Sequence, residues 1–62
     1  MYTGYIVEDR KCLQELRSNH YEKLEAWLVG KLREFKCATG LIVDNRSGKP
    51  ILEYQNEERK DL

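Results

Sequence analysis

The stretch from Arg10 to Lys36 constrains the fold most, because it is the segment long and periodic enough to bury a continuous apolar face. At about 100° per residue, seven of its side chains fall within about 120° of one another, the usual width of a core-facing helix stripe. They are Leu13, Leu16, His20, Leu24, Trp27, Leu28 and Phe35. We therefore predict one long amphipathic helix, with Asp9 as its N-cap and Gly40 just beyond its end.

One signal competes with a continuous helix. Ser18, Asn19 and His20 are three poor helix formers in a row, and Asn19 and Glu22 have the spacing of a capping box. A break there would start a second helix and give a helix-turn-helix. We favour continuity because the apolar stripe keeps its phase across these residues.

Strand patterns flank the helix. Tyr2–Glu8 is rich in β-branched and aromatic residues and predicts a strand, although both of its faces carry apolar groups. After the helix, Leu41–Asp44 and Lys49–Tyr54 predict a hairpin joined by the turn Asn45–Gly48. Residues 55–62 are polar and predict a flexible tail.

These elements predict an α+β fold, a small β-α-β-β domain over residues 1–54. A strand, a helix and a further strand favour a right-handed parallel crossover, so the helix would pack on a three-stranded mixed sheet. One helix covers one sheet face. Because the other face would expose some of four apolar side chains, we expect the chain to self-associate. These four are Tyr2, Ile6, Ile42 and Ile51.

The order of strand, helix and hairpin resembles the subunit layout of the 4-oxalocrotonate tautomerase family, whose small β-α-β-β chains are stable as oligomers. The chemistry of that family depends on an N-terminal proline exposed after removal of the initiator methionine. Residue 2 here is Tyr2. The resemblance therefore implies a mode of assembly and no activity.

Composition narrows the class of function. In 62 residues, 11 Lys and Arg balance 11 Asp and Glu, so the surplus of positive charge on which nucleic-acid binding depends is missing. The sequence contains no run of about 20 apolar residues, the length that a membrane-spanning helix needs. We therefore expect a cytoplasmic protein. Cys12 and Cys37 would lie near opposite ends of the helix, too far apart for a disulfide, and we expect reduced thiols packed as small apolar residues.

No pattern of catalytic residues stands out. His20 is eight residues from Cys12, so the two do not meet locally as a base and a nucleophile. Two cysteines without clustered histidines make a poor metal site. The turn around Ser47–Gly48–Lys49 lacks the glycines and the following helix of a phosphate loop. We therefore predict no catalytic, cofactor-binding or metal-binding residues.

Three functions remain, of which we favour the first. It is a small non-enzymatic regulatory or adaptor protein that binds another protein or itself, with five candidate partner-binding residues. The second is a DNA-binding regulator with a helix-turn-helix at Ser18–His20 and the hairpin as a wing. The third is an oligomeric enzyme whose inter-subunit site would use His20, Tyr21 and Cys12. The candidate partner-binding residues are Tyr2, Tyr5, Trp27, Lys31 and Tyr54.

Overall fold

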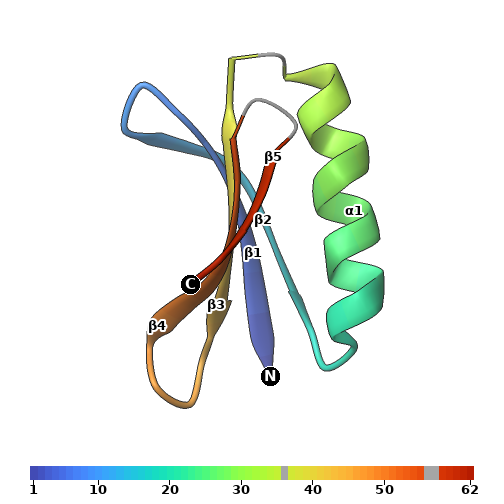
Figure 1. The fold of residues 1–62 in the computed structure, drawn as a ribbon, viewed down its shortest axis with the longest axis vertical. Helices are drawn as coiled ribbons and strands as arrows, with labels where there is room; N and C mark the ends of the chain where they lie inside the picture. Colours follow the sequence, from blue (N-terminus) through green and yellow to red (C-terminus); the bar gives the residue numbers. More distant parts are fainter. Residues whose placement is uncertain (36, 56–57) are drawn as a thin grey trace.

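The computed structural model describes residues 1–35, 37–55 and 58–62, which form one helix beside a twisted antiparallel sheet (Figure 1). In chain order the elements are β1 (Tyr2–Glu8), β2 (Lys11–Ser18), α1 (Tyr21–Glu34), β3 (Thr39–Asp44), β4 (Lys49–Gln55) and β5 (Glu58–Asp61).

The sheet has five strands in the order β2-β1-β3-β4-β5, and every neighbouring pair is antiparallel. The predicted three-stranded mixed sheet is therefore wrong. An additional strand, β2, reverses the chain before the helix, so β3 returns antiparallel to β1 instead of parallel to it. The β-α-β-β layout is also wrong, and with it the likeness to the tautomerase subunit.

The first half of the predicted helix is the strand β2. Asp9 and Arg10 have φ angles of 50° and 65° and form a tight turn that pairs Glu8 with Lys11. Positive φ at both central residues is the geometry of two-residue hairpins, which usually carry Asn-Gly there. A turn without that signature, followed by good helix formers, hid the hairpin from the sequence pattern.

Helix α1 begins at Tyr21, with His20 as an N-cap whose side chain makes no capping bond. The Ser18 hydroxyl instead accepts a hydrogen bond from the His20 backbone N–H at 3.0 Å. The alternative of a helix-turn-helix is wrong too, because the residues before Ser18 are extended. The predicted helix end at Lys36 lies outside the described residues.

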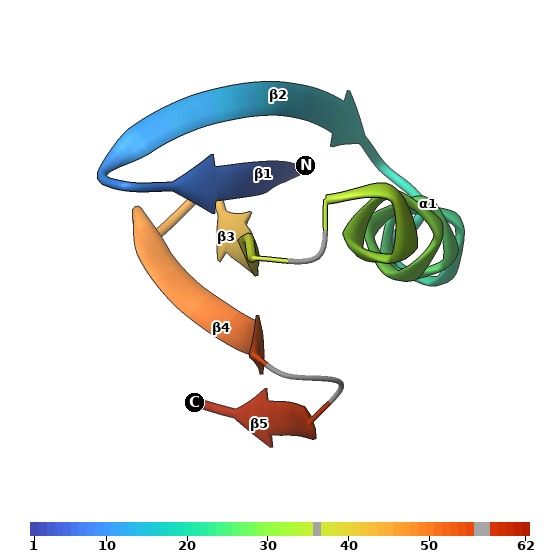
Figure 2. The same ribbon diagram turned by 90° about the horizontal axis from the view of Figure 1, so that it is seen from above.

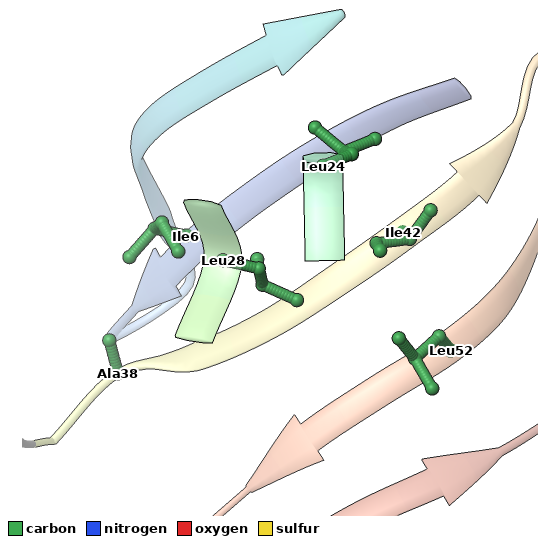
Figure 3. Packing of buried hydrophobic residues seen from close by; sticks show 6 residues of the cluster. All are labelled: Ile6, Leu24, Leu28, Ala38, Ile42 and Leu52. Carbon is green, nitrogen blue, oxygen red and sulfur yellow. The ribbon is translucent and has the colours of Figure 1, made fainter. Parts of the chain in front are cut away.

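The core lies between α1 and the sheet (Figure 3). Of the predicted stripe, Leu24 and Leu28 are fully buried and Trp27 and Phe35 are half-buried, whereas Leu13, Leu16 and His20 are exposed. Leu28 packs tightly over β3, because a Cβ on Gly40 would lie only 2.8 Å from its Cγ. Gly40 is therefore a packing residue in β3 and not the end of the helix. The buried apolar residues are Ile6, Leu24, Leu28, Ala38, Ile42 and Leu52.

The predicted strand Tyr2–Glu8 and the C-terminal hairpin are confirmed. The hairpin turn is held by the Gly48 N–H donating to the Asp44 carbonyl at 2.8 Å, with Gly48 at a φ of 72°. The segment expected to be a polar tail contributes β5, which pairs with β4. In that pairing Arg59 lies opposite Tyr54.

Candidate interaction surface

The two faces of the sheet differ in what covers them. Gly4 and Ile6 of β1 point toward α1, because a Cβ on Gly4 would lie 3.1 Å from both Leu24 and Trp27 and Ile6 belongs to the core. Side chains alternate along a strand, so Tyr5 points to the other face. Figure 2 shows α1 on one side of the sheet only.

The side of the sheet opposite α1, which we call the open face, has an apolar centre. Tyr5 lies opposite Leu41 across β1 and β3, and cross-strand partners share a face. Thr3, opposite Val43, is buried, and its hydroxyl donates to the side-chain oxygen of Asn45 at 3.0 Å. Four half-buried apolar side chains of this face do not belong to the helix-side core. They are Tyr5, Val7, Leu41 and Val43.

Charged side chains border that apolar centre on both sides. On β2, Glu15 lies opposite Tyr5 and Arg17 lies opposite Thr3. On the other side, Glu53 lies opposite Leu41, and Lys60 lies opposite Glu53. An apolar centre with a charged border is the usual anatomy of a protein–protein interface.

The two edges of the sheet are unlike one another. The edge strand β5 has four residues, all charged and exposed, a composition that discourages further strand pairing. The other edge, β2, has eight residues, and its Leu13 and Leu16 side chains are 39% and 41% exposed. β2 is the longer and more apolar of the two edges.

A polar cluster ties the C-terminal strands to the helix. The Tyr54 hydroxyl donates to Glu25 Oε2 at 2.8 Å, and Arg59 Nη1 donates to the same oxygen at 3.1 Å. Burial, and then the hydrogen bond to Glu25, raises the pKa of the Tyr54 phenol. Burial, and then the charge of Glu25, raises the pKa of Tyr21. These contacts hold β4 and β5 beside α1 and leave the phenols protonated at neutral pH.

The five predicted partner-binding residues do not form one surface. Tyr2 and Trp27 pack against the core on the helix side, where the Tyr2 ring meets Tyr21 edge-on with centroids 5.5 Å apart. Tyr54 also packs there and bonds Glu25. Lys31 is paired with Glu34 at 3.5 Å, with its side chain 30% exposed. Only Tyr5 lies on the open face.

The prediction that the uncovered face exposes some of Tyr2, Ile6, Ile42 and Ile51 is wrong, because Ile6 and Ile42 belong to the helix-side core and Tyr2 and Ile51 pack against it. Sequence reasoning missed Val7, Leu41 and Val43 of the open face and Leu16 of the β2 edge. The position of Gly4 offered the missing signal, because a glycine inside a strand often marks close approach by another element. That would have placed the helix over the even-numbered side of β1 and left Tyr5 on the other side.

The cysteine and histidine side chains do not form a catalytic or metal-binding group among the described residues. Cys12 and Cys37 are free and exposed, so the expected packing of these thiols as apolar residues is wrong. Cys12 lies near the start of β2, and His20 lies two residues beyond its end. The strand from Cys12 to Ser18 alone spans about 20 Å. Within the described residues, no group of His, Cys, Asp and Glu side chains is arranged to hold a metal ion. In the same part of the chain, no helix has the length and apolar character that a membrane crossing requires.

Comparison with known proteins assigns no family: no family model, no curated protein and no solved structure matches this chain. The geometry of the sheet is therefore what bears on function.

Proposed function

We propose that this chain is a small non-enzymatic adaptor or regulatory protein that acts by binding another protein, itself included, through its sheet. The observation that carries the proposal is the open face, where Tyr5, Val7, Leu41 and Val43 have no second layer over them among the described residues. A second protein layer on this face would remove apolar surface from water, the main driving force of association.

The charged border supports the same function. Glu15 and Arg17 on one side, and Glu53 and Lys60 on the other, carry both signs of charge. Such a border selects a complementary protein surface and does not favour a polyanion such as nucleic acid. The helix-turn-helix on which the DNA-binding hypothesis depended is not formed, since Lys11–Ser18 is a strand.

The test is quantitative capture from an extract of cells that make the protein. The wild type is compared with Leu41→Lys, which puts a charge in the middle of the open face, and with Ala26→Lys, which adds the same charge on an exposed helix position. We expect the wild type and Ala26→Lys to capture a common partner protein in equal amounts. Leu41→Lys should capture at least tenfold less of it.

Circular dichroism of each variant ensures that the loss is not caused by unfolding. An identical set of captured proteins for all three folded baits would count against the open face as the binding surface.

A further inference from the structure

The open edge of β2 has the features of a strand that pairs with a second copy of itself. We propose that two chains join β2 to β2 in antiparallel fashion, about a two-fold axis beside Leu16, and form one continuous ten-stranded sheet. This deepens the proposed function by naming one partner, a second copy, and one surface, the sheet edge.

Among the described residues, the outer edge of β2 is free to pair with another strand. β2 is the terminal strand of the sheet (Figure 2). Its side chains are mostly exposed. An edge strand presents unpaired N–H and C=O groups on alternate residues, which is the template for strand addition. The opposite edge, β5, is short and entirely charged.

The bulge in β2 limits where pairing can occur. Ile6 pairs with Gln14 while Val7 pairs with Cys12, so Leu13 is the additional residue of a β-bulge. Beyond it, Gln14–Ser18 pairs regularly with β1, residue for residue. A bulge disrupts regular pairing at a sheet edge, so Gln14–Ser18 is the segment that offers a regular edge.

Symmetry then fixes the register. A two-fold axis perpendicular to the sheet keeps both helices on the same side and pairs residues whose numbers add to an even constant. Pairing the five residues Gln14–Ser18 with their copies places the axis at the middle residue, so Leu16 lies opposite the Leu16 of the other chain. Both leucines are on the helix side, because Leu16 pairs with Gly4.

Charge complementarity follows from that register. Glu15 of each chain lies opposite Arg17 of the other, which makes two symmetric opposite-charge pairs on the open-face side. The neighbouring registers are unfavourable: an axis at Glu15 opposes two glutamates, and an axis at Arg17 opposes two arginines. The regular segment is thus self-complementary in only one of these registers.

The first experiment exchanges the charges. Sedimentation equilibrium of the wild type from about 5 to 500 µM should show a species of twice the 7.4 kDa chain mass that dissociates on dilution. Glu15→Arg or Arg17→Glu alone makes both cross-strand pairs like-charged and should raise the dimer Kd by about tenfold or more.

Mixing these two variants provides the matched control. In a mixed dimer each introduced arginine faces the introduced glutamate, and each native Arg17 faces a native Glu15. We expect the mixture to dimerise with a wild-type Kd. A wild-type chain that stays monomeric throughout, or variants that dimerise alone as tightly as together, would overturn the proposal.

The second experiment measures the register. In a Cys12→Ser/Cys37→Ser background, Leu16→Cys places two thiols directly across the axis, with Cα atoms about 4.5–5.5 Å apart, within the range of a disulfide. Leu13→Cys is the control, since Leu13 is equally exposed but would lie about 20 Å from its copy. Mild oxidation should cross-link the Leu16→Cys chain at least tenfold faster, and equal rates would refute the register.

These results are separable from those of the proposed function. If the chain is monomeric but still retains a protein that Leu41→Lys loses, self-pairing through β2 is refuted and binding through the open face stands.

Discussion

Gly40 offers a sharp test of how closely α1 packs on the sheet. A Cβ on residue 40 would lie 2.8 Å from Leu28 Cγ and 2.9 and 3.0 Å from its two Cδ atoms, and Leu28 is fully buried. Inserting a methyl group into such a packed contact costs about 1–3 kcal/mol. Removing the backbone freedom of glycine returns about 0.4–1 kcal/mol. Gly40→Ala should therefore destabilise the chain by about 1–2 kcal/mol.

Gly30 is the matched control, because it lies inside α1 and a Cβ there would meet no atom within 4 Å. Gly30→Ala should stabilise the chain by about 0.5–1 kcal/mol, the difference in helix propensity between the two residues. Urea unfolding followed by Trp27 fluorescence gives both free energies, at one protein concentration so that self-association does not enter the comparison. A Gly40→Ala protein as stable as Gly30→Ala would refute the tight contact between Leu28 and β3.

Two further predictions concern the first hairpin and the tyrosines. Arg10→Gly should raise the free energy of unfolding by about 1 kcal/mol, since Arg10 has a φ of 65° that glycine adopts without steric cost. A lower free energy of unfolding for this variant, measured by urea titration, would argue against the tight turn. Tyr54 and Tyr21 should titrate above pH 10 by absorbance at 295 nm, because burial raises both pKa values. The folded state then holds more protons than the unfolded state, so this contribution to stability is present below pH 10 and is lost as the pH rises through the raised pKa values. Glu25→Gln should lower the Tyr54 pKa relative to the wild type, and an unchanged Tyr54 titration would contradict the Glu25 contact.

Elements with a pattern of their own were predictable from sequence. Tyr2–Glu8 combines aromatic and β-branched residues, and the hairpin has Asn45 and Gly48 at its turn. These are local signals that the tertiary structure reinforces. The helix was also predicted over Tyr21–Glu34, where one face is buried.

Residues 10–20 were not predictable for a physical reason. β2 is an edge strand with both faces largely exposed, so it shows no alternation of polar and apolar residues. Leu13 and Leu16 happen to continue the phase of Leu24, and the residues between them are good helix formers. Pairing with β1 overrides that propensity. β5 is similar, because its four charged residues carry no strand signal and its place depends on β4 and on the contact of Arg59 with Glu25.

The candidate surface was half predictable. The sequence predicts one helix, and one helix can cover only one face of a sheet, so an uncovered face was predictable. Which residues lie there depends on which side of β1 the helix covers, and Tyr2 and Tyr5 look equivalent until Gly4 is seen to lie under Leu24 and Trp27. The β2 edge was hidden because the sequence pattern of β2 is helical.

Amide hydrogen exchange by NMR tests most directly the central structural claim, that β2 is an edge strand that pairs with a second copy of this chain. Backbone chemical shifts of Gln14–Ser18 should be those of a strand. Alternate amides of this segment, those pointing away from β1, should exchange up to about fivefold more slowly at about 500 µM than at about 20 µM as the edge pairs with its copy. Amides of β5 should not change with concentration. Helical shifts for Gln14–Ser18 would contradict the strand β2, and exchange that is the same at both concentrations would contradict the pairing of β2 with its copy.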